Sequence, residues 1–303
     1  MRVGFIGLGG MGKHIAERIV DAGHSLTVHD VREQPVNELA QYGAKTARSP
    51  KEVAAESEVV ISSLPSNESS IDVALSENGV LAGAKEGDIY IDTSTISPHV
   101  IRQVAAEAEK QGISVMDAPV SGGITQREEG SLTVMVGGAV ETLEKARPIL
   151  ESFGGRIFHT GAVGTGTTVK LINNLTLATN QIAAMEAMTL GVKAGIEVST
   201  LQEVISVSSG ASSAFNNMIH NVMTESTIPP KGNKPTRGLH TLVKDTALAS
   251  ELARELSVPL LAGSVATQAY RSCEARGWLE HEHWAVMQIF EELANIRVRP
   301  EHL

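Results

Sequence analysis

A lysine and an asparagine, Lys170 and Asn174, have the residue types and the spacing that suit proton transfer in this 303-residue chain. They lie four residues apart in the run GTGTTVKLINN, so a helix would place both side chains on one face. A lysine amine can take a proton from an alcohol or return one to a carbonyl. Its ordinary pKa of about 10.4 would have to be lowered by burial or a nearby positive charge before it could act as a base. The alternative is a surface lysine whose stem lies along an amphipathic helix.

A glycine-rich turn near the start of the chain predicts a dinucleotide site. The turn follows a predicted strand, opens a predicted helix and has the pattern GxGxxG. Its residues are Gly7, Leu8, Gly9, Gly10, Met11 and Gly12. This pattern lets the backbone approach a pyrophosphate, and the N–H groups of the helix N-terminus favour the phosphate charge. Asp30 ends the next predicted strand, 18 residues after Gly12, where a carboxylate accepts from the ribose 2′-hydroxyl. We therefore expect NAD as the cofactor, although Arg32 could receive the 2′-phosphate of NADP.

Three further strand ends carry residues that suit ligand binding. Leu64 and Pro65 follow one strand and Thr95 follows another, and ligands of open α/β sheets bind beyond the carboxyl ends of strands. In the run DTST, which contains Thr95, the alternative is that Asp92 or Ser94 caps the next helix. The turn formed by Ser121, Gly122 and Gly123 exposes backbone N–H groups that can receive an oxyanion, so we expect anion binding rather than a simple turn.

Composition narrows the class of protein. The chain has 35 acidic and 25 basic residues and no basic run, so we expect no nucleic-acid partner. Cys273 is the single cysteine, which fits a reducing compartment. We find no signal-peptide pattern and no apolar stretch long enough to span a membrane. We therefore expect a cytoplasmic protein with no membrane partner, and the histidines and acidic residues form no metal motif.

The order of elements predicts an α/β protein with two domains. Short β-branched runs alternate with amphipathic stretches through the first half, as in a doubly wound Rossmann sheet covered by helices. Strands are expected at residues 3–7, 26–29, 59–62, 89–92, 114–118, 132–136 and 156–159. Helices are expected at residues 167–194, 200–207, 241–256, 260–275 and 283–296. We place an NAD-binding domain at residues 1–162 and an all-helical substrate and dimerisation domain at residues 163–303, joined by the long helix 167–194.

Seven motifs together resemble the β-hydroxyacid dehydrogenase family, with its 3-hydroxyisobutyrate dehydrogenase branch as the nearest match. In chain order they are FIGLGGMG, SLP, DTSTISP, DAPVSGG, TVMVGG, GTGTTVKLINN and LVKDTALA. The resemblance implies NAD as cofactor, a 3-hydroxy acid or its semialdehyde as substrate, and a homodimer or homotetramer. It also implies that Ser121, Gly122 and Gly123 hold the substrate carboxylate and that Lys170 transfers the proton beside Asn174. It places Lys244 near the nicotinamide and Asp245 at the substrate.

Some alternatives and one departure from the family pattern follow from the same comparison. A semialdehyde reductase of the tartronate or succinic semialdehyde type, working mainly in the reducing direction, fits the same motifs. Asn173 argues against 6-phosphogluconate dehydrogenase, and Lys170 argues against an imine reductase. A catalytically silent nucleotide-binding scaffold is the alternative from another class. Arg237 stands where the family usually has a phenylalanine, which predicts a substrate more polar than 3-hydroxyisobutyrate. The alternative is that Arg237 points to solvent from a loop rich in proline and glycine.

Overall fold

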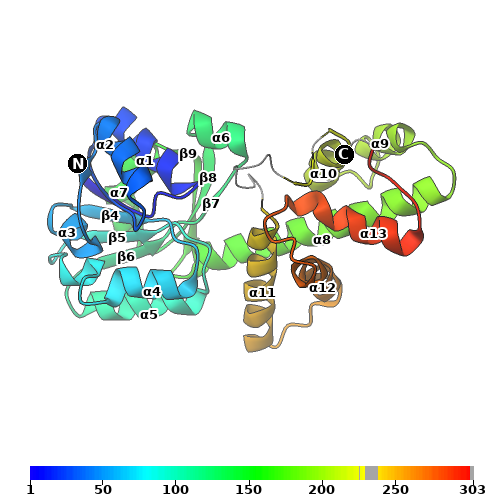
Figure 1. Cartoon of the computed structure of the whole chain (residues 1–303). Coiled ribbons are helices and arrows are strands. Elements are labelled where there is room, and N and C mark those ends of the chain that lie inside the picture. The colour runs from blue at the N-terminus through cyan, green and yellow to red at the C-terminus, as the bar shows by residue number, and fades with distance from the viewer. Residues whose placement is uncertain (225, 229–237, 301–303) are drawn as a thin grey trace. The chain divides into compact units, whose positions relative to one another are not determined.

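The computed structural model describes residues 1–224, 226–228 and 238–300. The chain divides into two compact units, Met1–Lys170 and Leu171–Leu303. The first is an α/β unit and the second is helical, which confirms the predicted fold class (Figure 1). Helix α8 (Thr165–Lys193) begins in the first unit and continues into the second. The domain boundary between residues 162 and 163 stays a prediction.

Nine strands form one sheet in the first unit, in the order β3-β2-β1-β4-β5-β6-β8-β7, with β9 paired to β8. They are β1 (Arg2–Ile6), β2 (Ser25–His29), β3 (Lys45–Thr46), β4 (Val59–Ser62), β5 (Ile89–Asp92), β6 (Ser114–Asp117), β7 (Val120–Ser121), β8 (Leu132–Gly137) and β9 (Gly154–Gly161). The pairs from β3 to β6 are parallel, whereas β8 is antiparallel to β6 and β7. The strand order reverses between β1 and β4, and ligands of doubly wound sheets bind at such a point.

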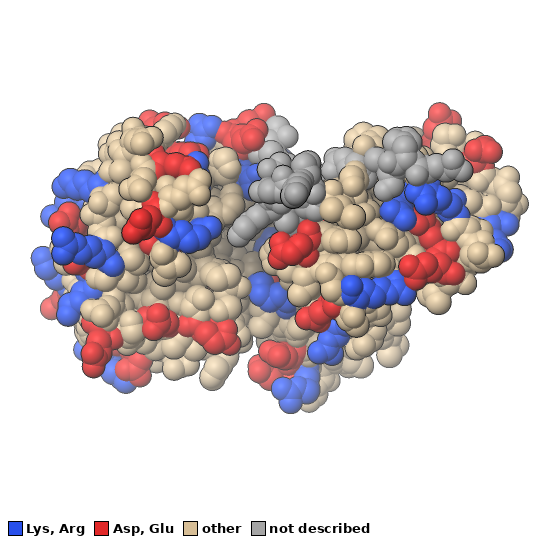
Figure 2. All heavy atoms as spheres, viewed as in Figure 1, with Lys and Arg blue, Asp and Glu red and all other residues tan. Residues whose placement is uncertain are grey.

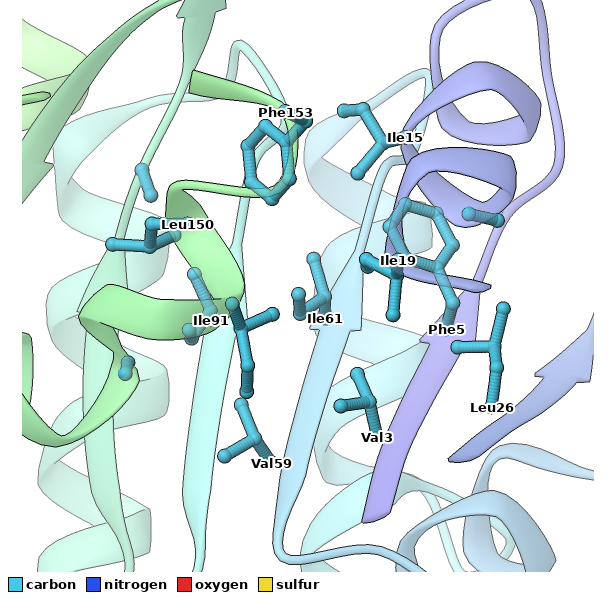
Figure 3. Close-up of a cluster of buried hydrophobic side chains, with 14 of the residues drawn as sticks. Val3, Phe5, Ile15, Ile19, Leu26, Val59, Ile61, Ile91, Leu150 and Phe153 are labelled. Carbon is cyan, nitrogen blue, oxygen red and sulfur yellow. The ribbon is translucent and has the colours of Figure 1, made fainter. Parts of the chain in front are cut away.

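Helices cover both faces of this sheet because its strands are apolar on both sides. They are α1 (Gly12–Asp21), α2 (Glu33–Gln41), α3 (Pro50–Ala55), α4 (Asn67–Leu75), η1 (Val80–Ala82), α5 (Pro98–Glu109), α6 (Ile124–Glu129) and α7 (Val140–Leu150). Successive residues of a strand point to opposite faces. Ile61 therefore packs in one cluster, with Phe5 and Ile15 (Figure 3), while Val60 packs in a second cluster with Ile101.

The second unit has a separate core built from helices. They are α8, α9 (Val198–Ser206), α10 (Ser213–Thr224), α11 (Leu239–Glu255), α12 (Leu261–Ala275), η2 (His283–Val286) and α13 (Met287–Ala294). Met185 and Met188 of α8 are fully buried in this core against residues that include Phe215 and Trp284. On the face shown in Figure 2, basic and acidic side chains are interspersed over both units.

Two of the strands and one helix of the second unit were absent from the sequence-based prediction. Strands β3 and β7 have only two residues each, so they carry no measurable alternation. Helix α10 has the sequence SAFNNMIHNVMT, in which serine, asparagine and histidine lower the helix propensity. Its apolar residues, among them Phe215, Met218 and Val222, are nevertheless buried in the core of the second unit. Tertiary packing thus favours a helix that local propensity does not predict.

Candidate active site

The glycine turn between β1 and α1 has the shape that a dinucleotide requires. Gly7 has a φ of +92°, and a Cβ there would overlap the carbonyl oxygen of Ser63. A Cβ on Gly12 would overlap the carbonyl oxygen of Gly7, so a glycine is needed for α1 to start this close to β1. A Cβ on Gly9, by contrast, would meet nothing within 4 Å. The chain therefore leaves room at Gly9, where the backbone can approach a phosphate group.

The first turn of α1 suits an anion. Met11, the N-cap residue, makes no side-chain capping hydrogen bond, and the first turn holds no acidic residue. A helix leaves its first N–H groups without helical partners, and the helix dipole adds partial positive charge at this end. The residues present thus fit the phosphates of NAD.

Asp30 lies at the end of β2 and is held by four hydrogen bonds from its own chain. Its Oδ2 accepts from the backbone N of Leu8 at 2.6 Å and from Nη2 of Arg32 at 2.9 Å. Its Oδ1 accepts from the backbone N and the Nε of Arg32, at 2.8 and 2.9 Å. Burial alone would raise the pKa of Asp30, but the hydrogen bonds from Arg32 and Leu8 outweigh it and lower that pKa. A carboxylate has about four acceptor positions, so a ribose hydroxyl must displace part of the Arg32 contact.

The strand ends that carry Leu64, Pro65 and Thr95 lie together in the first unit. The backbone N of Leu64 donates to Oγ of Ser94 at 2.7 Å, and the backbone N of Ser94 donates to Oδ1 of Asp92 at 2.8 Å. The first bond links the end of β4 to the end of β5, which are parallel neighbours, and the second fixes the turn after β5. Contacts of Leu64, Pro65 and Thr95 with the cofactor stay a prediction.

The turn at Ser121, Gly122 and Gly123 leads from β7 into α6. Gly122 and Gly123 are exposed, and Ser121 is half-buried and pairs with Thr133 of β8. The backbone N of Gly123 donates to Oε1 of Gln126 at 2.7 Å. That N–H is therefore occupied, and a substrate carboxylate would have to use Ser121 and Gly122 or displace Gln126. Anion binding at this turn stays a prediction.

Asp117, at the end of β6, anchors the start of the helix that carries Lys170. Its Oδ1 accepts from the backbone N of Gly164 and its Oδ2 from the backbone N of Thr167, both at 2.6 Å. Asp117 is 1% exposed, and burial raises the pKa of its carboxyl, although the two backbone hydrogen bonds oppose that rise. Sequence reasoning assigned no role to Asp117. Its partners are 47 and 50 residues away, so no local pattern could have identified them.

Glycines let α8 begin close to the sheet. A Cβ on Gly166 would overlap the carbonyl oxygen of Met135, and one on Gly137 would overlap Oδ1 of Asp117. The motif GTGTTVKLINN thus has a structural reason for its glycines. Lys170 follows on the same helix and is 8% exposed.

The second unit contains a polar group formed by the buried Asn174 and Asp245 and by the half-buried Lys244. Nδ2 of Asn174 donates to Oδ2 of Asp245 at 2.5 Å, and Nζ of Lys244 lies 2.7 Å from Oδ1 of Asp245. Asp245 is 0% exposed and Asn174 is 5% exposed. Asp245 thus orients an amide and an ammonium, and direct contact between Asp245 and a substrate stays a prediction. The same holds for contact between Lys244 and the cofactor.

Some predicted features are not tested by these contacts. Arg237 lies outside the described residues. Within residues 1–224, 226–228 and 238–300, no cluster of three or more His, Cys, Asp or Glu side chains could hold a metal ion. In the same part of the chain, no helix is long and apolar enough to cross a membrane.

Comparisons with known proteins match both units. Residues 2–161 match the family model described as the NAD binding domain of 6-phosphogluconate dehydrogenase. Residues 164–290 match the model described as NAD-binding of NADP-dependent 3-hydroxyisobutyrate dehydrogenase.

Two curated proteins and one solved structure are similar over nearly the whole chain. The mitochondrial 3-hydroxyisobutyrate dehydrogenase of Mus musculus is 38% identical over 96% of this chain and 87% of its own length. The NAD-dependent L-serine dehydrogenase of Pseudomonas aeruginosa is 37% identical over 96% of this chain and 98% of its own. A structure of Mycobacterium tuberculosis 3-hydroxyisobutyrate dehydrogenase with L-serine superposes with a TM-score of 0.85, at 33% identity over 95% of this chain and 98% of that one.

Proposed function

Because this chain belongs to the β-hydroxyacid dehydrogenase family, in its 3-hydroxyisobutyrate dehydrogenase-like branch, we propose that Lys170 is the proton-transfer residue of a 3-hydroxy acid dehydrogenase. The chain is an NAD-dependent oxidoreductase of hydroxy acids. The relatives' names support two substrate candidates, 3-hydroxyisobutyrate and L-serine, each of which carries a hydroxyl on the carbon next to a carboxylate-bearing carbon.

The burial of Lys170 is the observation that supports its role. A lysine with its stem on the surface of a helix keeps its side chain in water, whereas Lys170 is 8% exposed. Buried lysines are uncommon, because removing an ammonium group from water costs free energy. Residues that carry this cost are found preferentially at functional sites. Asp117 further supports the role, because its two hydrogen bonds hold the first turn of α8 in one position.

The residues divide the reaction between them. NAD, when bound, supplies the acceptor for the hydride that leaves the carbinol carbon. As the carbonyl forms, the alcohol O–H bond breaks and Nζ of Lys170, in its neutral form, takes the proton. In the reducing direction the protonated Lys170 returns that proton to the carbonyl oxygen. Ser121 and Gly122 hold the substrate carboxylate, and Asn174, oriented by Asp245, lies one helical turn from Lys170.

Removal of the lysine amine tests this assignment. We expect Lys170→Ala to lower kcat by about 100-fold or more, the usual contribution of general acid–base catalysis, while the Kd for NADH is unchanged. An added primary amine should restore part of the activity of Lys170→Ala, because it can replace the missing proton acceptor. Lys193→Ala is the matched control, since Lys193 lies at the end of the same helix and donates to the carbonyl of Ala294. If Lys170→Ala lost NADH affinity and kept its kcat, Lys170 would be a binding residue.

The substrate and the assembly belong to the same proposal. A panel of 3-hydroxy acids and their semialdehydes, including L-serine and 3-hydroxyisobutyrate, would identify the substrate by kcat/KM in both directions. We further propose a homodimer or homotetramer. Cytoplasmic residence stays a prediction from composition.

A further inference from the structure

We propose that Arg127, on α6, binds the diphosphate of the dinucleotide, so that the site has a cationic side chain in addition to the backbone of the glycine turn. The guanidinium lies at that turn: Nη1 of Arg127 donates to the carbonyl oxygen of Gly10 at 3.1 Å. A Cβ built on Gly10 would lie 4.0 Å from the same nitrogen. The proposal rests on NAD binding and is independent of the role of Lys170.

Arg127 has donor capacity that this structure leaves unused. Its Nε is buried and has no hydrogen-bond partner, and Arg127 forms no ion pair within the part of the chain that the structure describes. A buried N–H without an acceptor is costly, so such a group usually meets a ligand or a water. Phosphate oxygens would supply acceptors in the geometry that a guanidinium matches.

The other cations beside the turn are already paired with acids. Nζ of Lys13, in the first turn of α1, lies 2.5 Å from Oε2 of Glu38, and Nη2 of Arg32 lies 2.9 Å from Oδ2 of Asp30. Their charges are therefore largely compensated before any ligand arrives. The open space at Gly9 and the first turn of α1 can admit an anion beside Arg127. An uncompensated guanidinium next to that space favours a diphosphate there.

A purely structural role for Arg127 would be to attach α6 to the segment formed by the glycine turn and α1. That attachment already has a second bond of the same kind, because Nη2 of Arg18, in the last turn of α1, donates to the carbonyl oxygen of Glu128. Arg18 and Arg127 thus form a matched pair: each is an arginine that joins α6 to the segment of the glycine turn and α1 through a backbone carbonyl. They differ in that Arg127 reaches the glycine turn and Arg18 does not.

The test compares ligand affinities by calorimetry at a temperature where every variant is folded. We expect Arg127→Ala to raise the Kd for NADH about tenfold, as for the loss of a charge-assisted hydrogen bond. It should raise the Kd for ADP-ribose by the same factor, because ADP-ribose contains the diphosphate and lacks the nicotinamide. The Kd values of Arg127→Lys should lie between those of the wild type and Arg127→Ala, because a lysine keeps the positive charge but cannot donate two parallel hydrogen bonds as a guanidinium does. Added NaCl should weaken NADH binding less in Arg127→Ala than in the wild type.

Three results would overturn the proposal. The first is an unchanged Kd for both ligands in Arg127→Ala. The second is an equal loss of NADH affinity in Arg18→Ala, which would make Arg127 a structural residue. The third is a raised KM for the hydroxy acid with unchanged NADH and ADP-ribose affinities, which would place Arg127 in the substrate site. Failure of the wild type to bind NADH would instead contradict the assignment of the cofactor.

Discussion

Asp117 provides the sharpest test of how this fold positions its proposed catalytic lysine. Asp117→Ala removes a buried acceptor from two backbone N–H groups at the start of α8, those of Gly164 and Thr167. Hydrogen bonds to a charged group contribute about 1.5–3 kcal/mol each to stability. The substitution also removes the desolvation cost of the buried carboxylate, which offsets part of the loss. We therefore expect the free energy of unfolding to fall by about 3 kcal/mol.

That loss corresponds to a Tm lowered by about 6–12 °C for a unit of this size. It should be accompanied by a fall in kcat on the order of tenfold, because Lys170 follows the anchored turn directly and a small misplacement of a catalytic group slows the reaction. The Kd for NADH should stay within about twofold of the wild type, since the glycine turn is on another element.

Thermal unfolding and steady-state kinetics on one preparation check both parts. Ser49→Ala is the control, because Ser49 caps α3 in the same unit by accepting from the backbone N of Glu52 at 3.2 Å. It should cost about 1 kcal/mol and leave kcat unchanged. A destabilisation below about 1 kcal/mol with an unchanged kcat for Asp117→Ala would refute the reasoning.

Three further predictions concern the cofactor preference, the pH dependence of stability and the assembly. The wild type should have a higher kcat/KM with NAD(H) than with NADP(H). Asp30→Ala should reduce this preference, and the reduction should be larger when Arg32 is kept than when Arg32 is also replaced. Equal kcat/KM of the wild type with both cofactors would contradict this. Because the pKa of Asp30 is lowered in the folded chain, its stabilising contribution is present above its ordinary pKa of about 3.9 and is lost as pH falls through the lowered value. The Tm difference between the wild type and Asp30→Asn should accordingly disappear at acid pH. Light scattering at micromolar concentration should give a dimer or larger assembly, since Leu190 and Ile172 on α8 are 72% and 55% exposed; a monomeric mass would be inconsistent with it.

Local sequence determined most of the first unit. Strands β4 and β5 have the predicted bounds because short β-branched runs between turn residues leave little ambiguity. The glycine turn is equally local, since the residues that shape it and the helix that follows are consecutive. The sequence motifs were sufficient to identify the family, and the family indicates NAD as the cofactor.

Other features depend on contacts between residues far apart in the sequence. Leu190 and Met188 are both apolar residues of the predicted helix 167–194, yet Met188 is fully buried and Leu190 is 72% exposed. Only the neighbouring helices distinguish them. Similarly, the sequence indicated Arg32 only as a residue that could receive the 2′-phosphate of NADP. In the structure Arg32 donates three hydrogen bonds to the carboxylate of Asp30.

The site shows the same division. Sequence spacing alone placed Lys170 and Asn174 on one helix face, because helical periodicity is a local property. It could not reveal that Asp117 anchors that helix, that Asp245 holds Asn174 from 71 residues away, or that Arg127 meets Gly10 from 117 residues away. Such contacts form when the sheet and the helices pack, and packing is decided by the burial of apolar faces along the whole chain. The tertiary structure therefore decided which polar groups meet, while the sequence by itself determined which chemistry they carry.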